Sequence, residues 1–303
     1  MEKNYDAVKK LQVTKFQDRL NHMLNSLYKK GINIKVPNIE PFNIEFIDEI
    51  NEEQMKDVII ENVKSAYSPH TKTIYIYNSF ENSPQFEYHF TKRMLEHIST
   101  KLENGRIASG VSIKNGKNTF NESLNLAIIE SITNTMLGNE TIDEDTFKNY
   151  IIERYNLGLI ETIVGLETIL NSFFNSDYLM LESKFNSYNV EYKDIAKLMD
   201  KLTKVNYDLS YVKKEEDNDL ESKIFKLLIE AYAKRFGKEK NLNGKEKFKE
   251  NIVNSQTVRG TFGTANKFGY KDVDRNIITY ELVMSGLESA YTLSNNESVT
   301  VKK

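Results

Sequence analysis

The residues of this sequence that could do metal chemistry lie in two short stretches. His97 directly follows Glu96, and Glu130 lies in a later segment with helical periodicity. Imidazole nitrogens and carboxylate oxygens are ligands for zinc in proteins, and a carboxylate beside such an ion can accept a proton from metal-bound water. The chain contains no cysteine. A thiolate metal site and a cysteine nucleophile are therefore both excluded.

The segments that carry these residues follow a recognisable order. A strand-like run, KTIYIY, occupies 72–77, the helical run RMLEH occupies 93–97, and a predicted loop leads to a second helix with IESIT at 129–133. In zinc peptidases of the HExxH type, two histidines one turn apart on a helix bind the ion, and a third ligand follows on a later helix. The order strand, helix, loop, helix resembles the core of gluzincin-type metallopeptidases. The helices at 158–202 resemble the helical extension after such cores.

The resemblance implies a site whose reactive groups have been replaced. It puts the first histidine of the motif at Arg93, the base glutamate at Met94, the second histidine at His97 and the third ligand at Glu130. Arginine stays protonated and has no lone pair for zinc, and methionine cannot accept a proton from water. In the inverted HxxEH frame Glu96 is the alternative base, but Arg93 is still the first ligand. We therefore predict relic active-site positions, with no intact catalytic set and no metal site.

Glu130 interrupts an apolar run at 124–132, so its carboxylate is either buried with a partner or turned to solvent. For the buried case we predict that Arg93 pairs with Glu130 and supplies the positive charge of the lost metal. His97 would then be a neutral hydrogen-bonding neighbour. Removing one partner of a buried ion pair costs about 3–5 kcal/mol. On this hypothesis Glu130→Ala destabilises the fold strongly.

Composition limits the classes of partner and compartment. The 303 residues include 41 Lys and Arg and 44 Asp and Glu, for a net charge of −3, so there is no bulk electrostatic reason to expect nucleic acid. The N-terminus has no uninterrupted apolar run of the signal-peptide kind, and no window is apolar enough for a membrane-spanning helix. We expect a cytoplasmic protein with no membrane partner.

Hydrophobic periodicity predicts an α+β fold that is predominantly helical, with a zincin-like core of a small sheet and two helices. We expect a mixed α/β part at 1–140, a helical part at 141–292 and a flexible tail at 293–303. A charge cluster at 213–217 marks a soft boundary within the helical part. Before the RMLEH helix, the pattern predicts helices at 3–30 and 52–63 and strands at 42–47 and 66–77. After Gly138 it predicts helices at 143–155, 158–175, 177–188, 191–204, 217–236, 242–256 and 277–293.

The function that these observations favour is non-catalytic: a former peptidase cleft that now binds a peptide or protein, or acts as a scaffold, without a cofactor. One alternative is a zinc-dependent peptidase with non-standard ligands, namely His97 and Glu130 with His89 or His70. Tightly bound zinc and metal-dependent peptide cleavage would indicate it. The other alternative is a helical structural or assembly protein with no peptidase ancestry. A fold that lacks a sheet edge beside the Arg93 helix would favour that alternative.

Overall fold

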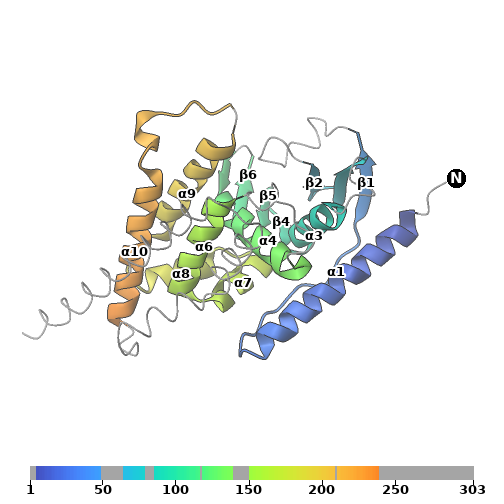
Figure 1. Ribbon diagram of the computed structural model, residues 1–303, viewed down its shortest axis with the longest axis horizontal. Helices are drawn as coiled ribbons and strands as arrows, with labels where there is room; N and C mark the ends of the chain where they lie inside the picture. The colour runs from blue at the N-terminus through green and yellow to red at the C-terminus, as the bar shows by residue number, and fades with distance from the viewer. Residues whose placement is uncertain are drawn as a thin grey trace, which may run out of the picture.

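The computed structural model describes residues 5–48, 64–78, 85–116, 118–138, 150–208 and 210–238. Within them the chain is α+β with mostly helical content, as predicted, and its two sheets are small (Figure 1). Several expected segments lie outside these residues: the helices at 52–63, 242–256 and 277–293, the start of the helix at 143–155, and the tail at 293–303.

The first helix, α1 (Tyr5–Tyr28), confirms the predicted N-terminal helix and its stop. The amide of Gly31 donates to the carbonyl of Tyr28, and the amide of Ile32 reaches back to Leu27. This pair of hydrogen bonds is a Schellman motif, and Gly31 supplies the left-handed residue that it needs, with φ of 80°. In Figure 1, α1 runs as a long rod along one side of the molecule.

The first sheet has the order β1-β3-β2. Its strands are β1 (Asn43–Ile47), β2 (Ser65–Ser68) and β3 (Thr73–Tyr77). The centre strand β3 is parallel to β1 and antiparallel to β2. The single strand predicted at 66–77 is therefore wrong: it is a hairpin, because the chain turns between β2 and β3, where Lys72 takes a φ of 51°.

A second sheet of four antiparallel strands lies where the sequence predicted only a loop. The strands are β4 (Thr100–Glu103), β5 (Arg106–Ser109), β6 (Ser112–Asn115) and β7 (Asn118–Phe120). Asn104 and Gly105 join β4 to β5 with φ angles of 50° and 75°. Two consecutive residues with positive φ are the type I′ hairpin turn, for which Asn-Gly is a preferred sequence.

The sheets are connected to a set of packed helices. These are α3 (Gln85–Ile98), α4 (Glu122–Leu137), α6 (Ile151–Val164), α7 (Leu166–Phe174), α8 (Leu179–Asn186), α9 (Tyr192–Tyr207), the 3₁₀ turn η2 (Glu215–Asp217) and α10 (Leu220–Lys238). The helix predicted at 158–175 is wrong in its bounds, because the chain breaks at Gly165, which has a φ of 88°. No described helix is long and apolar enough to cross a membrane alone; α6 and α7 satisfy the length and composition test only as a pair, bent by 111°.

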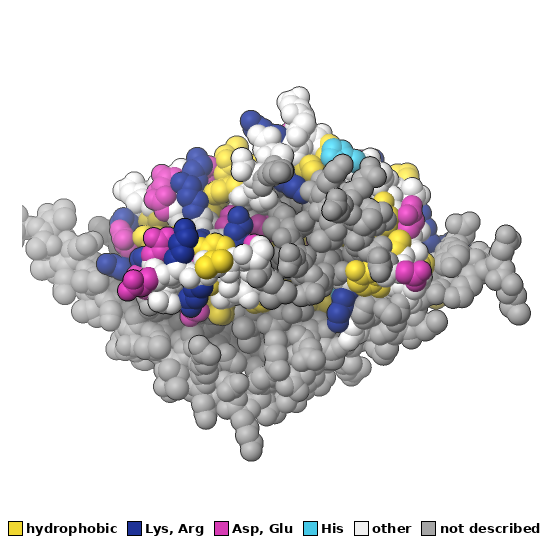
Figure 2. Space-filling view, turned by 90° about the horizontal axis from the view of Figure 1, so that it is seen from above, with side chains coloured by type: hydrophobic (Ala, Val, Ile, Leu, Met, Phe, Trp, Pro, Cys, Tyr) yellow, Lys and Arg dark blue, Asp and Glu magenta, His cyan; other side chains and the backbone are white. Residues whose placement is uncertain are grey.

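Helix α4 lies at the centre of the fold, in contact with α3, α6 and α9. One contiguous apolar core extends from Phe16 on α1 through α4 to Leu228 on α10. Beyond the charge cluster at 213–217, α10 packs back against α9 and α6. The face seen in Figure 2 carries acidic and basic side chains interspersed with apolar ones.

Candidate functional site

The buried glutamate of α4 is paired with α3, but through different residues from those predicted. The hydroxyl of Tyr88 donates to the two carboxylate oxygens of Glu130 at 2.7 and 2.6 Å. The ammonium of Lys92 forms an ion pair with the same carboxylate, and the side chains of Lys92 and Glu130 are only 9% and 2% exposed. Tyr88 and Lys92 are four residues apart, so they share one face of the helix. That face is turned toward α4.

Tyr150, which precedes α6, and Arg154 on α6 also lie beside Lys92 and Glu130. The ammonium of Lys92 lies 5.6 Å from the ring centroid of Tyr150 and 5.1 Å from that of Tyr88, so both rings can stabilise the cation. Burial, and next the charge of Glu130, raise the pKa of both tyrosines well above the usual value. Burial lowers the pKa of Arg154, and Glu130 opposes that shift. Both tyrosines are therefore neutral beside one buried carboxylate, and Tyr88 is the one that donates to it.

The predicted pair of Arg93 with Glu130 is wrong. The guanidinium of Arg93 binds Glu96 instead, at 2.6 and 2.7 Å, and its Nε donates to Ser65 on β2 at 3.0 Å. Successive helical residues differ by about 100° around the axis, so Lys92 and Arg93 cannot both face α4. Arg93 is directed to the sheet. Lys92, and not Arg93, is the residue that pairs with Glu130.

The other two positions predicted as relics, Met94 and His97, have surroundings of their own. Met94 is fully buried in the apolar core. The imidazole of His97 bonds the carbonyl of Glu40 through Nε2 and the hydroxyl of Tyr67 through Nδ1, both at 2.9 Å. Burial is the main effect that lowers the pKa of His97. A neutral ring fits these bonds, because a carbonyl only accepts and Nδ1 is then free to accept from the hydroxyl. His97 is a neutral hydrogen-bonding group, as predicted, but it is not a neighbour of Glu130.

The metal ligands of the peptidase alternative are not brought together. His97 is nine residues from Tyr88, which is about half a rotation around α3, so it faces away from Glu130. His89 lies at 3.2 Å from the hydroxyl of Ser65. In the part of the chain that the structure describes, no three His, Asp or Glu side chains form a group that could hold a metal ion.

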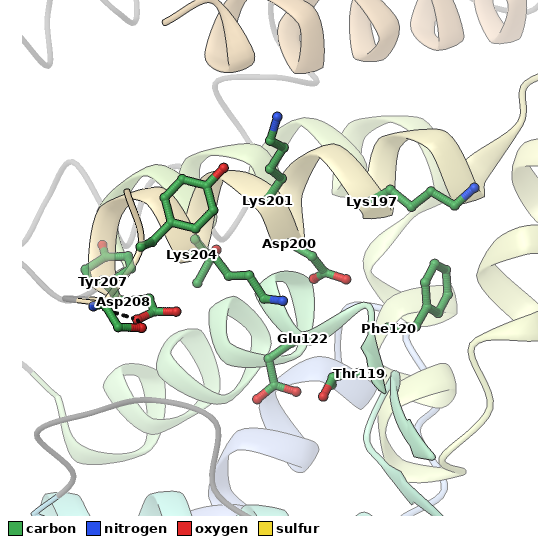
Figure 3. Close-up of a pocket in the computed structure, with 12 residues that line it drawn as sticks. Thr119, Phe120, Glu122, Lys197, Asp200, Lys201, Lys204, Tyr207 and Asp208 are labelled. Carbon is green, nitrogen blue, oxygen red and sulfur yellow. Dashed lines mark hydrogen bonds between the residues drawn. The ribbon is translucent and has the colours of Figure 1, made fainter. Parts of the chain in front are cut away.

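A second group of polar residues lines a cavity of about 540 Å³ between α9, β7 and the start of α4 (Figure 3). Sequence reasoning missed it, because its walls come from segments about 80 residues apart and no spaced motif marks them. The lining residues are Thr119, Phe120, Glu122, Lys197, Asp200, Lys201, Thr203, Lys204, Tyr207, Asp208, Ser210 and Tyr211. We call this cavity the α9 pocket.

Asp200 on α9 caps the N-terminus of α4. Its carboxylate accepts hydrogen bonds from the amide of Asn121 at 2.7 Å and from the amide of Ser123 at 2.9 Å. Asn121 takes a left-handed conformation with φ of 64° and makes no side-chain cap of its own. Burial raises the pKa of Asp200 to about 6, against the lowering effect of these amides. The helix cap is therefore supplied by another helix.

Glu122 occupies the wall of the pocket beside this cap. It accepts a hydrogen bond from Ser112 at 2.9 Å. Desolvation is the largest effect that raises its pKa to about 7, and the charge of Asp200 adds to the increase. Near neutral pH, Glu122 is therefore present both as a carboxylic acid and as a carboxylate.

The raised pKa of Glu122 predicts a pH-dependent stabilisation by Glu122→Gln. Between about pH 4.5 and 7 the folded state binds more protons than the unfolded state, so the stability of the native protein falls as pH rises through this window. Glutamine cannot ionise and avoids that loss. We expect the variant to be about 1–3 kcal/mol more stable than the native protein at pH 8, with little gain at pH 4, by urea denaturation. A variant that is less stable than the native protein at pH 8 would contradict this account.

No protein-family model, curated protein or solved structure matches this chain. Candidate functions are therefore inferred from two groups of side chains: the Glu130 cluster, formed by Tyr88, Lys92, Glu130, Tyr150 and Arg154, and the α9 pocket.

Proposed function

We propose that this chain is a catalytically inactive, zincin-like protein that acts in the cytoplasm as a binding or scaffold module for a peptide or protein. The observation that carries the proposal is the triad of Tyr88, Lys92 and Glu130, in which an i, i+4 pair on one helix faces a glutamate on the next. The ligands of an HExxH peptidase have the same spacing.

The sequence analysis placed the two histidine positions of the motif at Arg93 and His97. The triad places them five residues earlier, at Tyr88 and Lys92. The motif then runs from Tyr88 to Lys92, with His89 at the position of the base. A protonated lysine has no lone pair for zinc, and burial and the charge of Glu130 raise the pKa of the Tyr88 phenol, so it is neutral here. The ammonium of Lys92 instead supplies the positive charge that a metal would supply, and it balances Glu130.

The surroundings of α3 support a role in peptide binding. The helix contacts β2 and β3, and Arg93 donates to Ser65 on β2. Among the described strands, β2 and β1 stand at the two edges of this sheet; all four residues of β2 are buried, whereas those of β1 are exposed or partly buried. A partly exposed edge strand such as β1 offers main-chain groups to an extended peptide. An assembly protein without peptidase ancestry was expected to lack a sheet edge beside the Arg93 helix. The edge strand β2 contacts that helix, so this observation favours the binding module.

The proposal is tested by rebuilding the metal site. We expect Tyr88→His with Lys92→His to retain one zinc per chain after incubation and dialysis, because both imidazoles would then face Glu130. Arg93→His is the matched control: it completes an i, i+4 histidine pair with His97, in the frame that faces the sheet. We expect it to bind no more zinc than the native chain. Elemental analysis measures the metal, and circular dichroism shows that each variant is folded.

Two outcomes would contradict the proposal. If the native chain retained one zinc per molecule and cleaved casein only in its presence, the peptidase alternative would hold. If the Tyr88 and Lys92 variant were folded but bound no zinc, or if Arg93→His bound zinc instead, the triad would have no relation to an HExxH site.

A further inference from the structure

The α9 pocket shares no residue with the Glu130 cluster, so it requires an explanation of its own. Its volume of about 540 Å³ lies within the range of small-molecule sites. In Figure 3, Asp200 and Lys204 extend from α9 toward the inside, and Thr119, Phe120 and Glu122 approach from the opposite wall. The pocket therefore presents polar groups from two sides, together with the rings of Phe120, Tyr207 and Tyr211.

The formal charges in the pocket balance: Lys197, Lys201 and Lys204 stand against Glu122, Asp200 and Asp208. Several of them are also neutralised by the protein itself. Lys201 pairs with Asp217 at 2.6 Å and with Glu216 at 3.0 Å. Asp200 accepts the amides at the start of α4, and Asp208 accepts from Ser210. The walls thus favour neither a strongly cationic nor a strongly anionic ligand.

The groups that stay available both donate and accept hydrogen bonds. Ser112 occupies Oε2 of Glu122 and leaves Oε1 for a ligand. Within the described residues, the ammonium of Lys204 has no hydrogen bond or ion pair, although its charge acts to lower the pKa of Asp200 and of Asp208. In Figure 3 it points toward the carboxylates of Asp200 and Glu122. The ring of Phe120 is held edge-to-face by Tyr178, with centroids 5.4 Å apart. An apolar platform beside mixed donors and acceptors suits a ring that carries several hydroxyl groups.

We propose that the α9 pocket binds a neutral, hydroxyl-rich ligand of the size of a mono- or disaccharide. Glu122 and Lys204 form hydrogen bonds to its hydroxyl groups, and Phe120 packs against its C–H face. Each hydroxyl both donates and accepts, so such a ligand satisfies an acid and an ammonium together without adding charge.

Saturation-transfer NMR on the full chain tests this inference with maltose, cellobiose and lactose as probes. We expect at least one of them to bind and Lys204→Ala to weaken its binding about tenfold, the effect of one lost hydrogen bond of about 1.4 kcal/mol. Lys204 is exposed, so this variant keeps the fold. Phe120→Ala is a second variant that removes the platform, and Glu230→Ala on α10 is a control outside the pocket.

Three results would overturn the inference: no probe binds, the two pocket variants bind as the native chain does, or inorganic phosphate binds in the pocket while the sugars do not. The last result would identify an anion site. None of them affects the zinc experiment, because the two sites have no residue in common.

Discussion

Replacing Lys92 with methionine is expected to lower the free energy of unfolding by about 3–5 kcal/mol. The carboxylate of Glu130 is almost completely buried, and Lys92 forms the ion pair that compensates its charge. Without the ammonium, the carboxylate keeps the hydrogen bonds from Tyr88 but loses that pairing charge. Guanidinium denaturation at neutral pH measures the loss.

Two further variants separate the ion pair from simple packing. Combining Lys92→Met with Glu130→Met removes both charges, and we expect it to recover most of the stability, because apolar residues of similar volume often replace a buried pair at little cost. Arg93→Met removes the partner of Glu96, whose side chain is 15% exposed. We expect a smaller loss there, of about 1 kcal/mol. Equal losses at Lys92 and Arg93 would contradict the assignment of Lys92 as the partner of Glu130.

Gly110→Ala is expected to cost about 2–5 kcal/mol, the sum of overpacking and left-handed backbone strain. Gly110 has a φ of 57°, and a Cβ placed on it would lie 2.1 Å from Oδ1 of Asn125 and 2.6 Å from the ring of Phe173. Neither group can move freely: Asn125 accepts the amide of Val111 at 3.1 Å, and Phe173 is fully buried.

Gly116→Ala is the matched control for this prediction. Gly116 has nearly the same φ, 59°, but a Cβ there would meet nothing within 4 Å. Its loss should therefore reflect the backbone strain alone, about 1–2 kcal/mol. The difference between the two variants in thermal or chemical denaturation isolates the close contact of the β5–β6 turn with Asn125 on α4 and Phe173 on α7. If the two substitutions cost the same, that contact is not as tight as described.

Elements whose signals are local could be predicted from the sequence. The N-terminal helix has its apolar spacing and its Gly31 stop within one stretch, and β1 has a clear alternation. The second sheet was missed because its strands are only three or four residues long and too short to show a period. One signal was present: Asn104 and Gly105 form a hairpin dipeptide, and their sequence alone could have indicated the turn.

For Glu130, burial was one of the two cases that the sequence left open, but its partner could not be predicted from the sequence. The apolar run around it was compatible with burial, and the structure buries it. The partner of Glu130 depends on which face of α3 meets α4. Neighbouring residues on a helix point in different directions, so an error of one position in the facing residue replaces Lys92 with Arg93. The α9 pocket could not be predicted from the sequence for a different reason: Glu122 and Asp200 come together only after the chain between them has folded.

The cap of α4 also affects how the fold is completed. The carboxylate that binds the amides of Asn121 and Ser123 comes from Asp200, 79 and 77 residues later in the chain. When α4 is synthesised, the first turn of the central helix still lacks its acceptor, and it obtains one only when α9 docks. The two helices therefore gain their final stability in one cooperative step, and a chain that ends before α9 would expose the uncapped end of its own core helix.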